Sequence, residues 1–189
     1  HLEIADGAII KEEVKIYEKS QLTVSGGIIG SSYAHDHIYA YGESQINMIG
    51  GSISGCLRAC DNSTIIVKGG TINNDITTSQ NGKAIVYGGL VADDFYAGRY
   101  SSDNATLTLV GKDFAINGNP VDYGVYDTIG QDFLYGTLSG IFASGDYFSN
   151  NYVISGDSKL VLQAIPAPGA ILLGSLGLGC LRYVKRRSR

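Results

Sequence analysis

The segment "HDHIY" brings two imidazoles close together, at His35 and His37, with Asp36 between them. On an extended strand alternate residues share a face, so the two imidazoles would lie ~6.6 Å apart in Cα terms, near enough to share a metal ion. A zinc site needs three or four ligands, and the sequence identifies no others for this pair. We therefore interpret them as surface histidines, and we expect no bound metal and no cofactor.

Carboxylates are the second set of groups that could do chemistry. Asp93-Asp94 and Asp122 suggest the acidic clusters that hold calcium or act as acid and base on glycans. Adjacent carboxylates on a strand point to opposite faces, however, and no paired basic residues occupy matching positions to neutralise an acidic sugar. The nearest basic residues are Lys83, Arg58 and Arg99. We expect no catalytic residues and no enzymatic activity.

Cys56 and Cys60 are four positions apart, which on one strand separates them by roughly 13 Å. That distance is too long for a disulfide unless the chain turns between them. We interpret them as small side chains that pack inward or lie near a turn.

Tyrosines are frequent, with 13 in the chain. An aromatic strip could stack against sugar rings, although tyrosines in a β-rich chain more often cover strand faces. The residues considered for such a strip are Tyr33, Tyr39, Tyr41, Tyr87, Tyr96 and Tyr100.

Composition indicates the elements that must position these groups. The 189 residues include 26 Gly but only 3 Pro and no Trp, and Ile, Val, Ser and Tyr are common, which favours an all-β chain with many turns. Five of the 14 basic residues lie in the last eight positions, so the rest of the chain carries 9 basic against 18 acidic residues. Such an acidic body repels phosphate backbones, and we expect no nucleic-acid partner.

A repeat runs through the first part of the chain. Five segments align without gaps: "EKSQLTVSGGII", "GESQINMIGGSI", "DNSTIIVKGGTI", "QNGKAIVYGGLV" and the weaker "DNATLTLVGKDF". In each, two apolar residues alternate before a glycine, as in a strand with one buried face, and a polar pair precedes the unit as a turn signal.

Each unit therefore predicts a strand, a glycine corner, a short second strand, a loop and a polar turn, which is one coil of a solenoid. The predicted corner glycines are Gly26, Gly27, Gly50, Gly51, Gly69, Gly70, Gly88, Gly89 and Gly111.

This repeat resembles the right-handed parallel β-helix of many exported bacterial proteins, in which each coil pairs with those above and below it. We expect the solenoid to span residues 1–116, with residues 1–19 as the end of an earlier coil. Residues 117–163 then form an irregular β cap that covers the last coil.

The end of the chain has a different character. An apolar stretch from Ala170 to Leu181 predicts a short hydrophobic helix, within a C-terminal region of residues 164–189. A basic cluster follows it and would hold the C-terminus in the cytoplasm. Its members are Arg182, Lys185, Arg186, Arg187 and Arg189.

Pro166, Ala167, Pro168 and Gly169 stand directly before this stretch, and the order of parts resembles the PEP-CTERM sorting signal of bacterial surface proteins. The family has Glu where this chain has Ala167. The resemblance implies transient anchoring in the inner membrane and recognition by an exosortase-like sorting enzyme that cuts near the motif.

These features together predict an exported, surface-associated protein, with a structural or adhesive role in the bacterial envelope or exopolysaccharide matrix. Polysaccharide is the expected contact. The alternatives are a secreted β-helix enzyme that degrades polysaccharide and a glycan-binding module.

Overall fold

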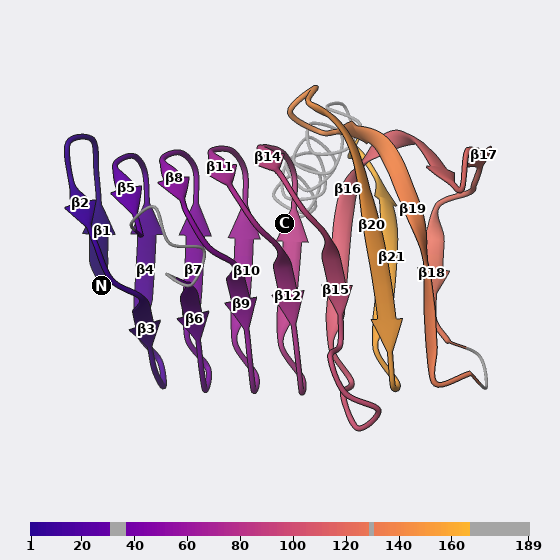
Figure 1. Ribbon diagram of the computed structural model, residues 1–189, viewed down its shortest axis with the longest axis horizontal. Helices are drawn as coiled ribbons and strands as arrows, with labels where there is room; N and C mark the ends of the chain where they lie inside the picture. Colours follow the sequence, from indigo (N-terminus) through magenta and orange to yellow (C-terminus); the bar gives the residue numbers. More distant parts are fainter. Residues whose placement is uncertain (31–36, 129–130, 167–189) are drawn as a thin grey trace, which may run out of the picture.

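The structure, a computed structural model, describes residues 1–30, 37–128 and 131–166. All regular elements in these residues are β-strands, and they form a β-solenoid of about five turns (Figure 1). The prediction of an all-β solenoid is confirmed. The hydrophobic helix predicted in the C-terminal region lies outside the described residues, and nothing in the described part is a helix long and apolar enough to cross a membrane.

Each coil contains three strands, so the solenoid has three faces. The first face contains β1 (Leu2–Ile4), β4 (Gln21–Val24), β7 (Gln45–Met48), β10 (Thr64–Val67), β13 (Lys83–Val86) and β16 (Thr106–Ile116). The second contains β2 (Ile9–Ile10), β5 (Ile28–Ile29), β8 (Ser52–Ile53), β11 (Thr71–Ile72) and β14 (Leu90–Val91). The third contains β3 (Val14–Ile16), β6 (Ile38–Ala40), β9 (Leu57–Ala59), β12 (Ile76–Thr78) and β15 (Phe95–Ala97).

Two of these observations differ from the sequence interpretation. The third strand of each coil was not predicted, because its three residues lie in the stretch interpreted as a loop. Residues 1–19 form a full coil with three strands, rather than only the end of one.

Equivalent strands of successive coils pair in parallel and in register. Ile65 lies beside Ile46 of the coil before it and Ala84 of the coil after it. The same alignment on the third face places Thr77 between Arg58 and Tyr96. Residues at one position of every coil therefore form straight rows along the solenoid.

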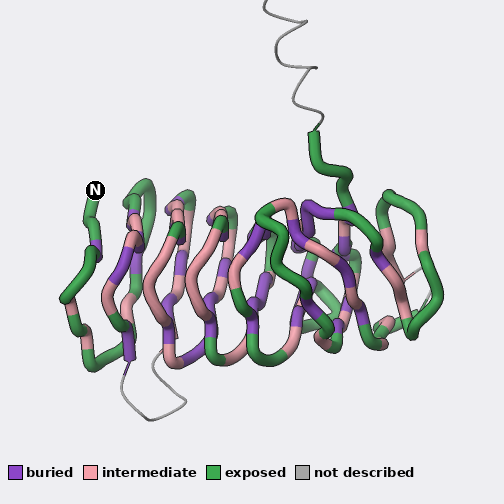
Figure 2. Tube along the Cα trace, turned by 90° about the horizontal axis from the view of Figure 1, so that it is seen from above, coloured by how far each residue is buried: buried purple, intermediate pink, exposed green. Residues whose placement is uncertain are grey.

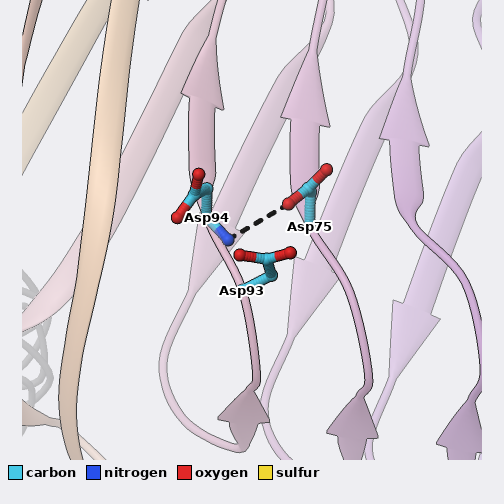
Figure 3. Close-up of side chains that lie close together, drawn as sticks. All are labelled: Asp75, Asp93 and Asp94. Atoms are coloured by element: carbon cyan, nitrogen blue, oxygen red, sulfur yellow. Dashed lines mark hydrogen bonds between the residues drawn. The ribbon is translucent and has the colours of Figure 1, made fainter.

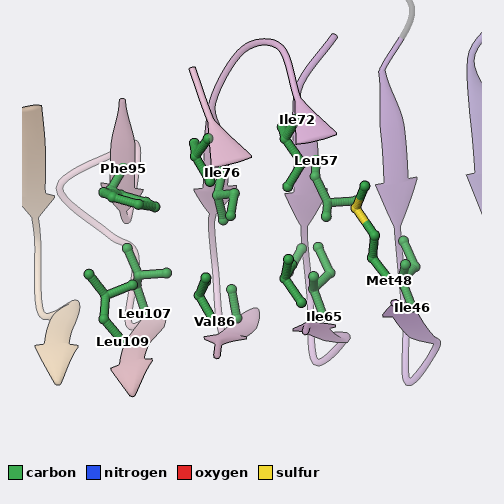
Figure 4. Close-up of a cluster of buried hydrophobic side chains, with 14 of the residues drawn as sticks. Ile46, Met48, Leu57, Ile65, Ile72, Ile76, Val86, Phe95, Leu107 and Leu109 are labelled. Carbon is green, nitrogen blue, oxygen red and sulfur yellow. The ribbon is translucent and has the colours of Figure 1, made fainter. Parts of the chain in front are cut away.

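The core consists of the inward rows (Figure 4), and along β7, β10 and β13 the buried residues alternate with exposed or partly exposed ones (Figure 2). Ile46, Ile65 and Leu107 stack in one such row and are at most 1% exposed. Complete burial of a side chain of this size contributes about 1.5–3 kcal/mol, so each coil is stabilised mainly by its neighbours.

The paired glycines lie where the first strand of a coil turns into the second. Gly70 has φ +92°, and a Cβ atom there would lie 2.8 Å from the carbonyl oxygen of Gly50 in the preceding coil. The corner thus requires a left-handed backbone conformation and a close approach between coils. The other pairs, Gly26-Gly27, Gly50-Gly51 and Gly88-Gly89, occupy the equivalent corners.

Gly111 does not lie at a corner, in contrast to the prediction. It is within the long strand β16, where a Cβ atom would lie 2.2 Å from the carbonyl oxygen of Ile141. The fifth repeat lacks the second glycine, and β16 continues there through an irregularity between Lys112 and Ala115 instead of ending at a corner.

Beyond β16 the pairing changes from parallel to antiparallel. The strands are β17 (Asn119–Pro120), β18 (Gly124–Tyr126), β19 (Phe133–Phe142), β20 (Tyr147–Ser155) and β21 (Lys159–Ala164). β19 pairs antiparallel with both β16 and β20, while β20 and β21 continue the third and first faces in parallel. These strands therefore join the two faces at one end of the solenoid (Figure 1).

The turn between β19 and β20 docks on the corner of the fifth coil. The Gly89 amide donates to Asp146 Oδ2 at 3.0 Å, and the Ser144 hydroxyl donates to the same oxygen at 2.7 Å. These two hydrogen bonds, the Gly89 amide first, lower the pKa of the Asp146 carboxyl.

A ladder of side-chain hydrogen bonds runs from coil to coil along the polar turns that connect the third face to the first. The Asp61 carboxylate accepts the Gly42 amide, the Gln80 side chain accepts the Asp61 amide, and Asp103 accepts the Gln80 amide, at 2.8–3.0 Å. Asp103 is 2% exposed and also accepts the Arg99 and Tyr100 amides at 2.6 and 3.0 Å. Three amide donors stabilise its buried charge.

Replacing Gly70 with Ala is expected to lower the free energy of unfolding by about 2–3 kcal/mol, because the substitution combines positive-φ strain with an atomic overlap between coils. Urea unfolding measures the loss. Gly145→Ala is the matched control, since Gly145 has φ +97° but nothing within 4 Å of its Cβ position. Equal losses in the two variants would contradict the close approach of the coils.

The substitution Asp103→Ala should destabilise the protein by about 3 kcal/mol, because three buried amides lose their acceptor. Asp103→Asn keeps the shape and should fall between Ala and the native residue in urea unfolding. An unchanged midpoint in Asp103→Ala, as expected for the exposed control Glu12→Ala, would refute the role of this carboxylate.

A lowered pKa in the folded state means that Asp146 stabilises the docked turn fully above the ordinary pKa of an aspartate. That contribution disappears as the pH falls through the lowered value. The melting temperature of the native protein should therefore fall more than that of Asp146→Asn when the pH is lowered from about 6 to about 3. Parallel losses in both proteins would show that this carboxylate does not anchor the turn.

Candidate functional site

The third face of the solenoid brings together most of the groups that could do chemistry. We define the central row as the outward residues at the middle of each strand of this face: Lys15, Tyr39, Arg58, Thr77, Tyr96 and Val153. We define the polar row as the residues directly before β6, β9, β12 and β15, together with the residue of β20 at the matching register: His37, Cys56, Asp75, Asp94 and Asn151. Both rows follow from parallel pairing in register.

Hydrogen bonds connect the polar row from coil to coil. The Cys56 amide donates to His37 Nδ1 at 2.9 Å, and the Asp94 amide donates to Asp75 Oδ1 at 3.1 Å. Asn151 Nδ2, from β20, donates to Asp94 Oδ1 at 3.0 Å. Two backbone amides and one side-chain amide therefore hold the side chains of His37, Asp75 and Asp94 in place.

Of the two predicted imidazoles, only His37 can be placed. Its ring meets the Tyr39 ring edge-on, with centroids 5.7 Å apart. His35 and Asp36 lie outside the described residues.

The carboxylates of Asp93 and Asp94 do come close together, and Asp75 joins them (Figure 3). One ligand oxygen from each of the three lies within 4.8 Å of the others. Slight desolvation, followed by the charges of Asp75 and Asp94, raises the pKa of the exposed Asp93 carboxyl. Oxygen ligands of this kind suit hard cations such as calcium, but exposed acidic groups often cluster without one.

Asp122 does not belong to this cluster. It lies before β18, where its carbonyl oxygen accepts the Tyr126 hydroxyl at 2.7 Å. Asp75 was missed by the sequence analysis because Asn74-Asp75 has the composition of an ordinary turn.

Arg58 and Arg99, interpreted from the sequence as merely nearby, line one depression together with Asp75, Thr77 and Tyr96. Arg58 lies over the Tyr39 ring at 5.5 Å from the centroid and donates to Cys56 Sγ at 3.6 Å. The Arg99 backbone is fixed by the Asp103 carboxylate. The depression exists because Thr77 is short while its neighbours in the central row are long.

Cys56 and Cys60 are free, and they flank β9. Cys56 is buried and donates to Asp75 Oδ2 at 3.5 Å. Cys60 lies near the turn and contacts the Ser79 hydroxyl at 3.4 Å, and burial raises the pKa of its thiol.

The tyrosines divide into groups rather than forming one strip. Tyr39 and Tyr41 stack at 5.7 Å, and Tyr41 stacks on Tyr17 at 5.2 Å. Tyr96 lies at the depression, where burial and the charges of Asp75 and Asp94 raise the pKa of its hydroxyl. Tyr87 and Tyr100 lie outside these groups, after β13 and after β15 respectively, and Tyr33 lies outside the described residues.

Of the predicted sorting motif, only Pro166 belongs to the described part of the chain. It is exposed and follows the last strand. Ala167, Pro168, Gly169 and the basic residues from Arg182 to Arg189 lie outside it.

Comparisons of the chain with protein-family models, with curated proteins and with solved structures found no match. The candidate site is an outward surface of aromatic, cationic and acidic groups on a regular scaffold.

Proposed function

We propose that the protein is an exported, surface-associated element of the bacterial envelope or exopolysaccharide matrix, with a structural or adhesive rather than enzymatic role. The observation that carries the proposal is the third face, whose outward groups recur at one position of successive coils. The side chains differ from coil to coil, but their positions repeat at the fixed spacing of the strands, and such a row suits an extended polymer such as polysaccharide, which can contact several coils at once.

The aromatic and cationic groups on this face support sugar contact. Tyr39 has Lys15 on one side and Arg58 on the other, at 5.6 and 5.5 Å from its ring centroid. These cations, with Tyr41 stacked beside it, hold the Tyr39 ring in one orientation, so the exposed part of the ring offers a sugar an apolar contact at a fixed place.

The proposal also covers the handedness of the solenoid and the C-terminal sorting signal. The coil has the right-handed sense of parallel β-helices, and the tail beyond Pro166 forms a short apolar helix that anchors the chain in the inner membrane. An exosortase-like enzyme then cuts near the Pro-Ala-Pro-Gly motif. The order of proline motif, apolar stretch and basic cluster supports this part.

A polysaccharide-degrading enzyme is the second candidate, and the carboxylate cluster of Asp75, Asp93 and Asp94 favours it. A raised carboxyl pKa, as at Asp93, is one property of a general acid. Product formation separates this candidate from the first.

Mass analysis of the native protein from its own host tests the sorting signal. The mature protein is expected to lack the segment after the proline motif and to leave the membrane fraction, whereas a variant with Pro166 and Pro168 both changed to Ala should keep its full mass. An intact tail on membrane-bound native protein would contradict sorting.

Incubation with acidic and neutral polysaccharides tests whether the third face binds polysaccharide. The protein should be retained on polysaccharide without forming reducing ends or unsaturated products. Tyr39→Ala should weaken retention about three- to tenfold through lost stacking, while Tyr87→Ala, outside the third face, should have no effect. Turnover that disappears in Asp93→Asn would favour the enzyme instead.

A further inference from the structure

The first half of β19 forms an open sheet edge at the end of the solenoid opposite to the N-terminus (Figure 1). One side of β19 pairs with β20 from Phe133 to Ile141, whereas the other side pairs with β16 only between Leu138 and Phe142. Residues 133–136 therefore have a strand on one side and, among the described residues, no strand on the other.

Hydrogen bonds next to this segment show which backbone groups face the open edge. The Asn117 amide donates to the Thr137 carbonyl oxygen at 2.8 Å, and the Thr137 amide donates to Asn117 Oδ1 at 2.9 Å, so both backbone groups of Thr137 face away from β20. Alternate residues of an antiparallel strand direct these groups to the same side, so those of Tyr135 and Phe133 face the open edge. No described residue bonds to them there. Unpaired amide and carbonyl groups are a template for another strand.

The side chains at this edge are aromatic and exposed. Phe133 is 55% exposed, Tyr135 is 69% exposed, and their ring centroids lie 6.0 Å apart. Residues 133–136 include no charged side chain, whereas the end strands β1 and β3 contain Glu3 and Lys15. Charged residues on an edge discourage pairing with another chain, so the β19 edge lacks a protection that those strands have.

The edge is complementary to a second copy of itself. Antiparallel pairing about a two-fold axis at Leu134 places Phe133 of one copy opposite Tyr135 of the other, and each such pair can exchange both amide-to-carbonyl bonds. Aromatic residues that face each other across strands stabilise a sheet. Asp132, the nearest charged residue of the segment, would lie opposite Gly136, so no like charges meet.

We propose that two copies of the chain associate by antiparallel pairing of residues 133–136. Tyr135 lies beside Val153 of the central row, so the pairing joins the third faces of the two copies in one continuous sheet. The contact involves one short segment from each copy and buries less than the ~1,200 Å² of a stable dimer, so the association is weak and depends on concentration. This inference goes beyond the proposed function and does not depend on it.

Sedimentation equilibrium of the full chain in density-matched detergent tests the association. The native chain is expected to be a monomer at about 1 µM and mainly a dimer at about 0.5 mM. Tyr135→Pro should remain monomeric at both concentrations, because proline removes the amide that faces the second copy. The same variant should keep the native melting temperature at the lower concentration, since that amide does not bond to β20.

A matched pair of tyrosine variants separates edge pairing from general stickiness. Tyr135→Ala should weaken dimerisation about tenfold through lost aromatic contact across the two copies. Tyr147→Ala removes a side chain that is also 69% exposed, at the start of β20, and should leave dimerisation unchanged.

Mixing isotopically labelled and unlabelled copies tests the register. At 0.5 mM, as for the native dimer above, a nuclear Overhauser contact is expected between the α protons of Leu134 in the two copies, because that residue forms the close non-hydrogen-bonded pair at the two-fold axis. A native chain that stays monomeric would overturn the proposal. Equal dimerisation of the native chain, Tyr135→Pro and Tyr147→Ala would also overturn it, because the contact would then lie elsewhere on the chain.

Discussion

Parallel pairing in register between coils is the constraint on which the rest of the structure depends. The carbonyl and amide groups of each coil bond to the coils before and after it, so a position in one coil predicts its neighbours in the next. Inward rows become a continuous apolar core, and outward rows become a surface with a fixed spacing. A slip of one residue in any strand would exchange the two sets.

The turns maintain this register where the strands are too short to do so alone. A two- or three-residue strand makes few hydrogen bonds, and the side-chain ladder from Asp61 through Gln80 to Asp103 adds one contact per coil at the same corner. Because Asp103 also holds the Arg99 backbone, this structural ladder positions a cation at the depression. Fold and candidate site therefore share one buried carboxylate.

The sequence carried enough information to predict the solenoid but not its third face. Alternating apolar residues before Gly-Gly identify the first strand and corner, since both depend on local backbone requirements. The third strand is only three residues long. Its segments "IYA", "LRA", "ITT" and "FYA" are each too short to be distinguished from a loop when they are taken one at a time. Their spacing of 19 residues was the available signal, and it also connects His37, Cys56, Asp75 and Asp94. That Arg58 and Arg99 line one depression depends in addition on the turn held by Asp103, and residue spacing does not predict this turn.

Nuclear Overhauser contacts across the third face test most directly whether the register assembles the site. With uniformly labelled protein, the account predicts contacts between the backbone protons of Thr77 and those of both Arg58 and Tyr96. Contacts of Thr77 with Leu57 and Phe95 as its direct partners would instead mean a shifted register. The row of outward groups would then not exist, and the candidate site would fall with it.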